Sequence, residues 1–288
     1  MILHALPCEE YIKYHGGKKM NITYLGTSAA EGFPAIFCNC SYCNEARRLG
    51  GKNVRTRSQA LINQNLLIDF PADTYAHFLQ NGIRGDAIEY LLFTHAHMDH
   101  FYSKDLFLRE GFYAHDMIAP TLKVFCPKTV YESFDNPPKN VDITMLEAYK
   151  TVEIDAYKIT PLPARHMFGS EAFIYIIQEE KTLLYAHDTG YFYDEVFDYI
   201  ENQKIAFDMV SLDCTNVDIP ISDEGSHMGF PNIERVLHRL HTIGAIKEST
   251  VKYVNHFSHN GNPIHEILEK RAKEYDCFVS YDGCHVTF

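Results

Sequence analysis

The sequence predicts an α/β fold in which short buried strands alternate with amphipathic helices. Short apolar runs recur along the chain, and segments with helical spacing of apolar residues follow several of them. Chemically active side chains stand just past the ends of several strand-like runs, where open α/β sheets place their sites. With 288 residues, 46% of them apolar, the chain can bury a sizeable core.

The elements follow a regular order after the Gly-Gly-Lys-Lys break that ends at Lys19. Strands are expected at 20–26, 65–70, 90–94, 157–164, 172–178, 182–188, 206–213 and 251–257. Helices are expected at 72–80, about 102–109, 191–200, 233–244 and 263–275. The first helix is stopped by Asn81-Gly82, and a Glu-Glu-Lys turn joins two of the strands like a hairpin.

Composition limits the class of protein. The net charge is −12 and no run of Lys or Arg exceeds a pair, which argues against a nucleic-acid polymer as the main partner because phosphate neutralisation needs clustered cations. No apolar stretch approaches a membrane span, and the opening residues lack a basic leader. Eight scattered cysteines fit a reduced, cytosolic protein better than a disulfide framework.

The sequence allows two interpretations of residues 1–19. We expect residues 1–19 to be an N-terminal extension and residues 20–288 to form a single domain, although Met20 could equally be the true start. The aromatic and Pro-rich segment 111–150 is expected to cap or border the site. Nothing in the sequence decides the oligomeric state, and a homodimer stays open.

The stretch "FTHAHMDHF" concentrates His95, His97, Asp99 and His100 between an expected strand and an expected helix. Alternate side chains of an extended segment point the same way, and a turn at the junction brings His100 to the same region. Two imidazoles would serve one metal, and the Asp-His pair would serve a second. Such ligands suit Zn²⁺, Mn²⁺ or Fe²⁺. The alternative is a polar loop whose histidines only meet solvent.

The stretch "FCNCSYC" places Cys38, Cys40 and Cys43 in a C-x-C-x2-C pattern. Three thiolates this close predict a structural zinc, which needs a fourth ligand. The candidates for that ligand are Cys8, Cys126, Cys214, Cys277, Cys284 or a histidine. The alternative is that the three are spare buried thiols.

The motif "THAHMDH" resembles the HxHxDH signature of the metallo-β-lactamase superfamily, and the resemblance extends over most of residues 20–288. It implies a four-layer αββα sandwich with a pair of metals at one edge of the sheets. It also points to later ligands in "PLPARHMFG", "TLLYAHDTG" and "VNHFSH". The implied ligands are His95, His97 and His166 for one metal, Asp99, His100 and His256 for the other, and Asp188 spanning both.

Within this superfamily the chain is similar to the phosphoribosyl cyclic phosphate phosphodiesterases of phosphonate breakdown. The resemblance rests on "YLGTSAAEGFPAIFCNCSYC" and on "HFSH", and it implies His259 as the fourth ligand of the structural zinc. It implies that His227 contacts the phosphate or protonates the leaving oxygen, that Asp99 is also catalytic, and that Asp69 supports the histidine loop. Asp213 is expected to give similar support, whereas His227 could instead be a solvent-exposed loop residue.

The function expected from this resemblance is hydrolysis of a small, anionic, cyclic phosphodiester. Lactam-hydrolysing members usually have a cysteine where this chain has Asp188, and a bridged metal pair suits phosphodiesters. A water between two cations loses a proton near neutral pH, and the bridging hydroxide becomes the nucleophile. The expected cofactors are two divalent metals (Mn or Zn, otherwise Fe) and one structural Zn.

Three other functions remain open at this stage. A tRNA 3′-processing nuclease would need a basic arm, which the sequence does not display. A thioester hydrolase would share the ligands. A carrier-like protein is suggested by a quinone-cofactor biosynthesis relative with the same Gly-Phe-Pro and cysteine pattern, but the complete ligand set argues against an inactive site.

Overall fold

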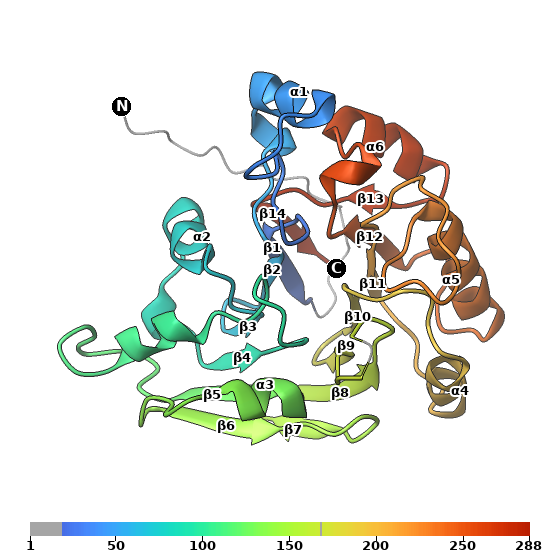
Figure 1. The fold of residues 1–288 in the computed structure, drawn as a ribbon. Helices are drawn as coiled ribbons and strands as arrows, with labels where there is room; N and C mark the ends of the chain where they lie inside the picture. The colour runs from blue at the N-terminus through green and yellow to red at the C-terminus, as the bar shows by residue number, and fades with distance from the viewer. Residues whose placement is uncertain (1–18, 168) are drawn as a thin grey trace.

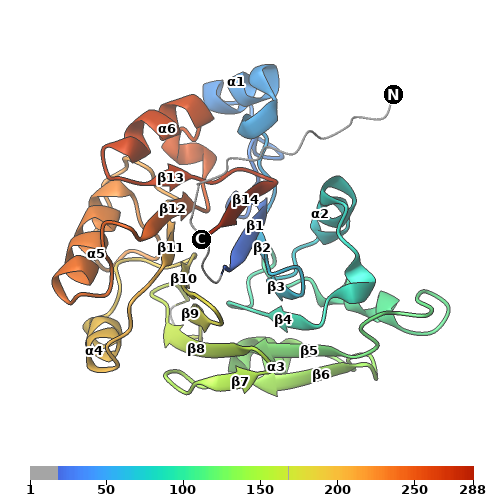
Figure 2. The ribbon, with the colours of Figure 1, turned by 180° about the vertical axis from the view of Figure 1, so that it is seen from behind.

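The computed structural model describes residues 19–167 and 169–288. Nearly all of the expected N-terminal extension, and with it Cys8, therefore lies outside the described residues. Two seven-stranded sheets face each other, and helices cover their outer faces (Figure 1). This arrangement is the four-layer αββα sandwich that the resemblance implied. A view from behind shows that the two sheets meet at an angle (Figure 2).

The first sheet holds most of the N-terminal strands together with the last strand of the chain. Its strands, in spatial order, are β14 (Cys284–Thr287), β1 (Asn21–Gly26), β2 (Gln59–Ile62), β3 (Leu66–Ile68), β4 (Tyr90–Leu92), β5 (Leu122–Cys126) and β6 (Val141–Met145). Strands β3 to β6 run parallel to one another. Strand β14 pairs antiparallel with β1, β1 with β2, and β2 with β3.

The second sheet is formed by the strands in between. Its spatial order is β13 (Phe278–Val279), β12 (Val251–Asn255), β11 (Met209–Asp213), β10 (Thr182–Ala186), β9 (Phe173–Gln178), β8 (Tyr157–Pro163) and β7 (Val152–Ile154). Strands β10 to β13 are parallel, and β7 to β10 form an antiparallel meander. The expected hairpin between β9 and β10 is confirmed.

The helices are short and lie outside the sheets. They are α1 (Ser41–Leu49), α2 (Thr74–Asn81), α3 (Lys128–Ser133), α4 (Asp194–Asn202), α5 (Phe230–Thr242) and α6 (His265–Lys273). The 3₁₀ turns are η1 (Gly51–Asn53), η2 (Gly85–Ala87), η3 (Ser103–Arg109) and η4 (His259–Gly261). Helices α4, α5 and α6 cover the second sheet, and α2 lies outside the first (Figure 1).

Three apolar layers hold the four structural layers together. The central layer lies between the sheets and includes Tyr24, Tyr175 and Tyr185. A second layer packs the outer face of β9 to β12 against α4, α5 and α6, and a third packs the outer face of β1 to β6 against α3 and η3. Helix α5 shows why: Ile233, Val236 and other apolar residues at helical spacing are buried on one side.

Most expected elements are present, but α1, β2, β7, β13 and β14 were not expected, and two segments differ from their expected form. The segment expected to be helical near 102–109 is the 3₁₀ helix η3, in which Leu106 is buried while two neighbouring apolar residues remain exposed, so it behaves as a connector. The segment 111–150 contains β5, α3 and β6, which the sequence did not reveal. Helix α2 ends at Gly82, whose φ of 64° closes the helix in the left-handed region, as expected.

Strand direction gathers the carboxyl ends of many strands at one edge of the sandwich. Strands β3 and β4 in one sheet and β8, β10, β11 and β12 in the other all end there. The residues directly after these strands therefore meet across the two sheets. This edge is where an α/β sheet is expected to hold its site.

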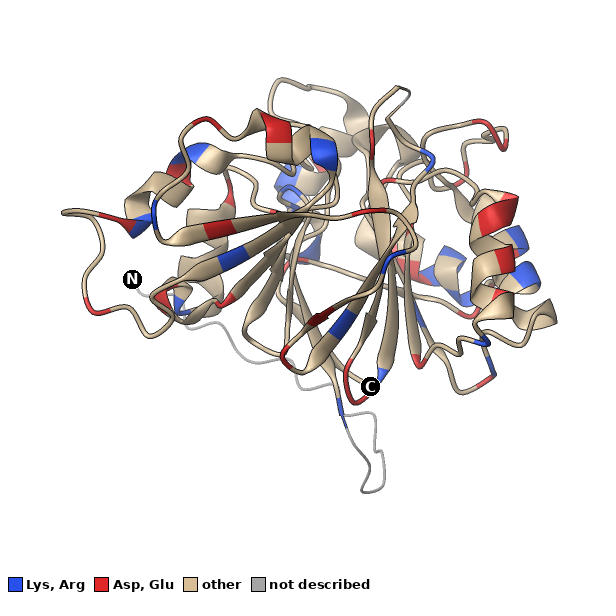
Figure 3. Cartoon of the chain, turned by 90° about the horizontal axis from the view of Figure 1, so that it is seen from below, with Lys and Arg blue, Asp and Glu red and all other residues tan. Residues whose placement is uncertain are grey.

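The charged residues are spread over the surface. Along the described residues, Lys and Arg alternate with Asp and Glu on helices and strands (Figure 3). Among those residues no helix has both the length and the apolar character needed to cross a bilayer.

Candidate metal centre

The loop after β4 brings together the first set of candidate ligands. His95 Nε2 lies 2.9 Å from His97 Nδ1, and His166 Nε2, from the loop after β8, lies 2.9 Å from the same His97 atom. His95 is fully buried, while His97 stands at the surface. Three imidazole nitrogens therefore converge from two elements on one point, as neutral ligands of a single cation do.

A second set lies beside the first. The ligand-type atoms of Asp99, His100 and His256 lie within 4.8 Å of one another. His100 Nε2 lies 3.3 Å from Asp99 Oδ2. Because these residues come from the loop after β4 and from the end of β12, the second set joins the two sheets.

Asp188, at the end of β10, stands between the two sets. Its Oδ1 lies 3.5 Å from His166 Nε2, and its Oδ2 lies 3.1 Å from His100 Nε2 and 3.0 Å from His256 Nε2. The carboxylate thus reaches one member of the first set and two of the second. This is the position in which one carboxylate can serve two cations.

The donor atoms at the centre fit divalent cations. Within the described residues, His100 Nε2 and His256 Nε2 lie 3.1 and 3.0 Å from Asp188 Oδ2, but none of these three buried atoms makes a hydrogen bond of suitable geometry. Buried polar atoms without partners are costly. Imidazole and carboxylate are preferred ligands of Zn²⁺, Mn²⁺ and Fe²⁺, so a cation at this point would satisfy all three atoms.

Buried groups behind the histidine loop fix the orientation of one imidazole from each set, His95 and His100. Thr94 donates through its backbone N–H to Asp69 Oδ1 (2.8 Å) and through its hydroxyl to Asp69 Oδ2 (2.8 Å). The hydroxyl is thereby left to accept His95 Nδ1–H (2.9 Å), and His100 Nδ1 donates to Asp69 (2.7 Å). Both imidazoles therefore turn Nε2 toward the centre, which is the usual role of such supporting groups.

A matching arrangement lies behind the second set. Asp213, at the end of β11, accepts the backbone N–H groups of Asp188 (3.1 Å) and Thr215 (3.0 Å). The Thr215 hydroxyl lies 2.8 Å from His256 Nδ1. Asp213 thus holds the loop of Asp188 and, through Thr215, the ring of His256.

His227 lies at the rim of the centre. Its Nδ1 donates to Asp213 (2.9 Å), its ring stacks on His256 at 5.4 Å, and it stands edge-on to His166 at 4.7 Å. Burial acts to lower the pKa of His227, but the Asp213 carboxylate outweighs it and raises the pKa to about 9. Cations bound at the centre would oppose that rise.

Two glycines bring the His227 loop close to the Asp188 loop. A Cβ at Gly190 would lie 1.8 Å from the carbonyl oxygen of Gly225, so neither loop could approach the other with a side chain there. A cleft of about 700 Å³ opens beside His166, with Lys128 and Tyr193 also in its walls. Of segment 111–150, the part from Lys128 onward lines this cleft, through Lys128, Thr129, Glu132 and Ala148.

The cysteine cluster is assembled away from this centre. Cys40 Sγ and Cys43 Sγ each lie 3.7 Å from His259 Nδ1, and Cys38 Sγ accepts the backbone N–H of Cys40 (3.4 Å). The hydrogen bond with His259 lowers the pKa of Cys40 to about 6, whereas burial raises the pKa of Cys43 to about 12. The four ligand-type atoms lie within 4.8 Å of one another. Among the candidates for the fourth ligand of the structural zinc, His259 is therefore the residue that lies at the cluster.

The ligand-type side chains described above were all named from the sequence, but parts of their support were missed. Thr94 and Thr215, which orient His95 and His256, were not anticipated, nor was the Ser226 carbonyl that lies 3.1 Å from His166 Nδ1. Thr94 directly precedes the histidine motif. The hydroxyl residue directly before the motif could have indicated a group that orients His95.

Comparison with known proteins agrees with this architecture. The sequence model described as the beta-lactamase superfamily domain matches residues 64–257. No curated protein sequence gives a match.

Three solved structures illustrate the similarity in fold. A diphosphatase from the PhnP family has 18% identity and a TM-score of 0.72, with 94% of this chain and 97% of that chain covered. Zn²⁺-bound PqqB from Methylobacterium extorquens has 16% identity and a TM-score of 0.69, with 92% and 99% covered. The short form of human tRNase Z has 13% identity and a TM-score of 0.59, with 92% and 98% covered. Because the matched family spans most of the chain, from β3 to the end of β12, the protein belongs to the metallo-β-lactamase superfamily.

Proposed function

We propose that the protein is a dinuclear metal-dependent hydrolase of small phosphodiesters, cyclic ones in particular. The observation that carries the proposal is the position of Asp188 between two complete sets of ligand-type side chains, with unpartnered buried atoms at their centre. The similar structures include one named a diphosphatase and one named a tRNase. Those names favour phosphoester over thioester chemistry.

The proposed ligands follow from the geometry. His95, His97 and His166 would hold one cation, Asp99, His100 and His256 would hold the other, and Asp188 would contact both. When bound, such a pair activates water at neutral pH and takes up charge on phosphoryl oxygens. Mn²⁺, Zn²⁺ and Fe²⁺ all suit this donor set.

His227 is proposed to supply the proton that the leaving oxygen needs. Its Nδ1 is bound to Asp213, which leaves Nε2 for the substrate. The carboxylate behind the ring favours its protonated form, so the imidazolium can donate a hydrogen bond to a phosphoryl oxygen or a proton to the departing alkoxide. Asp99, a proposed ligand of the second cation, is also proposed to be catalytic.

The proposed substrate is small and anionic. The cleft beside His166 has room for a compact organic group, and its charged lining residues are Lys128, Glu132 and Glu171, with Lys128 paired to Glu132 at 3.7 Å. A long polyanion would need a basic face, whereas the net charge is −12 and the described charges are mixed in sign (Figure 3). A cytosolic location and a homodimer remain predictions.

A separate structural zinc is proposed at Cys38, Cys40, Cys43 and His259. The thiolate character of Cys40 and the backbone N–H groups that donate to Cys38 and Cys40 are features of such sites. Metal analysis of the purified protein should then find zinc in addition to the two catalytic cations.

The test is hydrolysis of bis(p-nitrophenyl) phosphate and of a five-membered cyclic phosphodiester by manganese-loaded protein. Asp188→Ala should abolish turnover, because it removes the carboxylate shared by both ligand sets. Asp194→Ala, which alters an exposed aspartate paired with Arg239, is the matched control and should retain full activity.

Two results would contradict the proposal. Fewer than two cations bound at the centre under metal-replete conditions would exclude the dinuclear site. Fully metallated protein without turnover of either phosphodiester would exclude the proposed reaction. Thioesters would then be assayed next, followed by a search for a bound quinone intermediate.

A further inference from the structure

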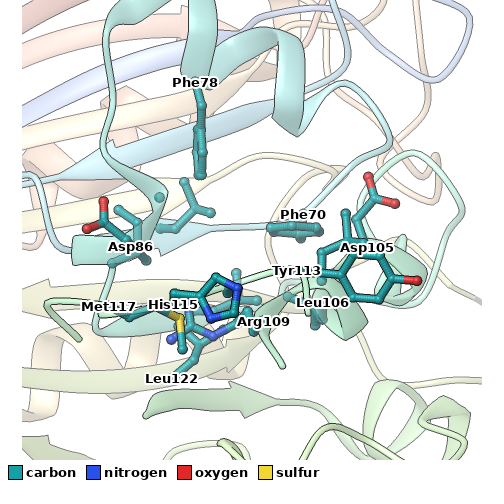
Figure 4. A pocket seen from close by; sticks show the side chains of 16 residues that line it. Phe70, Phe78, Asp86, Asp105, Leu106, Arg109, Tyr113, His115, Met117 and Leu122 are labelled. Carbon is teal, nitrogen blue, oxygen red and sulfur yellow. The ribbon is translucent and has the colours of Figure 1, made fainter. Parts of the chain in front are cut away.

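A second cavity lies on the outer face of the first sheet. It has a volume of about 370 Å³, which is in the range of small-ligand sites. Leu67 of β3 and Leu91 of β4 line it, and Phe78 of α2 and Met117 of the loop before β5 stand on different sides of it (Figure 4). The body of the cavity is therefore apolar.

A guanidinium group stands at one end of this cavity. Arg109, the last residue of η3, lies beside His115 (Figure 4). Its Nη2 donates to the carbonyl oxygen of Ala119 (2.8 Å), while its Nε is buried and has no hydrogen-bond partner within the described residues. Burial lowers the pKa of Arg109. The guanidinium is thus partly desolvated and has unused donors.

The mouth of the cavity exposes apolar side chains. Leu108 is 49% exposed and Tyr113 is 73% exposed, and both line the cavity. Phe112 and Ile118 are exposed on the same loop. Contiguous exposed apolar residues on a folded protein usually mark a binding surface.

We propose that this cavity is a binding site for a small amphipathic carboxylate, an apolar monoanion whose chain or ring fills the cavity and whose carboxylate pairs with Arg109. A carboxylate matches the planar donors of a guanidinium. The apolar lining from β3, β4 and α2 would bury the rest of the ligand.

The acidic residues of the lining favour a monoanion over a phosphate ester. Asp105 and Asp86 both line the cavity. Asp86 is paired with Arg84 at 2.6 Å, but Asp105 adds negative charge to the lining. A more highly charged ligand would be repelled, so this cavity and the metal centre would select different molecules.

The cavity is close to the metal centre without sharing residues with it. Phe70, in its wall, donates its backbone N–H to the carbonyl oxygen of His100 (2.8 Å), and Tyr102 donates to the carbonyl oxygen of Phe70 (2.8 Å). The loop that carries the histidine motif is therefore hydrogen-bonded to a wall of the proposed ligand site.

The test uses decanoate, below its micellar concentration, with full-length metal-loaded protein labelled at the methionine methyl carbons. The methyl signal of Met117 should shift saturably, since Met117 lines the cavity. Met98, 81% exposed in the histidine loop, reports binding of the carboxylate to the metal centre and should not move. Decanol, the neutral analogue, should bind at least about tenfold more weakly.

Matched variants separate the charge of Arg109 from effects on folding. Arg109→Gln should weaken decanoate binding by about tenfold or more, whereas Lys104→Gln, an equal charge change on the same 3₁₀ helix outside the lining, should leave it unchanged. Leu108→Asp should weaken binding relative to Leu108→Asn, because the new charge stands at the exposed mouth.

Several outcomes would overturn the inference. These are an unmoved Met117 signal, a shift of Met98 alone, or equal affinity in the Arg109 and Lys104 variants. A concentration-dependent dimer that Phe112→Ser dissociates would show that a second copy of the chain covers the mouth, and it too would overturn the ligand site. All these readouts are independent of phosphodiesterase activity.

Discussion

At the scale of single residues, three positions at the centre have an unusual backbone. Asp69, Asp188 and His256 lie at the ends of strands with φ of 63°, 53° and 64°. Side chains other than glycine rarely adopt this region, and each such residue costs about 1 kcal/mol or more. The left-handed residue turns the chain sharply as the strand ends. Each side chain is thereby directed toward the neighbouring strand ends instead of along its own sheet.

Asp69 gives a prediction at this scale. Asn tolerates a positive φ, so Asp69→Asn should fold, but its amide cannot accept from both His100 Nδ1 and Thr94 as the carboxylate does. The affinity for the catalytic cations should fall by about 10- to 100-fold. Chelator competition measures this, with Asp142→Asn, an exposed residue of β6, as the control. Unchanged affinity would exclude a supporting role for Asp69.

A second buried network predicts a pH dependence. Gln59 Oε1 accepts His77 Nδ1–H (2.6 Å), and the Thr56 hydroxyl lies 2.7 Å from His77 Nε2 and 2.6 Å from Asp282 Oδ2. Desolvation lowers the pKa of His77 to about 4 and raises that of Asp282 to about 6. Stability from neutral His77 is lost as pH falls from its unfolded pKa toward 4. Stability from protonated Asp282 is lost as pH rises through 6.

These opposite dependences should nearly cancel between pH 4 and 6. Asp282→Asn removes one of them, so the unfolding free energy of the variant, relative to the parent, should rise with pH across this window. Because His77 is common to both proteins, this relative rise reflects the lost dependence on Asp282 and is at most about 3 kcal/mol. Urea unfolding at several pH values measures it. Parallel curves for the two proteins would contradict the assignment of the proton to Asp282.

At the scale of elements, the sequence indicated most of the buried strands, with β2 and β5 as exceptions, and it missed the four strands at the sheet edges. Strands β9 to β12 are almost entirely buried and read clearly as apolar runs. Strands β6 and β7 are edge strands with one neighbour each, and both have exposed positions, three in β6 and one in β7. Because half-exposed edge strands lack a continuous apolar pattern, neither β6 nor β7 could be assigned.

The cysteine cluster gives a prediction at the scale of one helix. Cys40 caps α1, accepting the N–H of Cys43, and meets His259 from the other end of the chain. Cys40→Ser should remove one zinc per chain and lower the thermal midpoint, because a bound structural zinc stabilises the folded state. Zinc analysis and calorimetry test this. Cys277→Ser, at a buried cysteine outside the cluster, should keep all its zinc.

At the scale of the whole molecule, the sequence could place side chains on faces but could not pair the strands. Periodicity shows which residues are buried, yet it does not tell which strands share a sheet. That β14 completes the first sheet beside β1 depends on contacts between the two ends of the chain. The expectation of two facing sheets therefore came from the resemblance to a family and not from the pattern of apolar residues.

The shared layer between the sheets predicts how residues 20–288 unfold. Met20, Tyr175 and Val286 belong to one buried cluster contributed by both sheets, so neither sheet can lose its partner without exposing its own core. A single transition is expected, in which the calorimetric and van't Hoff enthalpies agree. Two resolved transitions in metal-loaded protein would divide the chain into separate domains.

The spacing of His256 and His259 has a consequence for metal exchange. One short segment after β12 contributes to both clusters, so ordering this segment at one cluster prepares it for the other. If filling the catalytic centre increases the affinity for zinc at the cysteines by some factor, thermodynamic reciprocity requires zinc to increase the affinity of the catalytic centre by the same factor. Zinc limitation would then reduce catalytic metallation even when manganese is abundant.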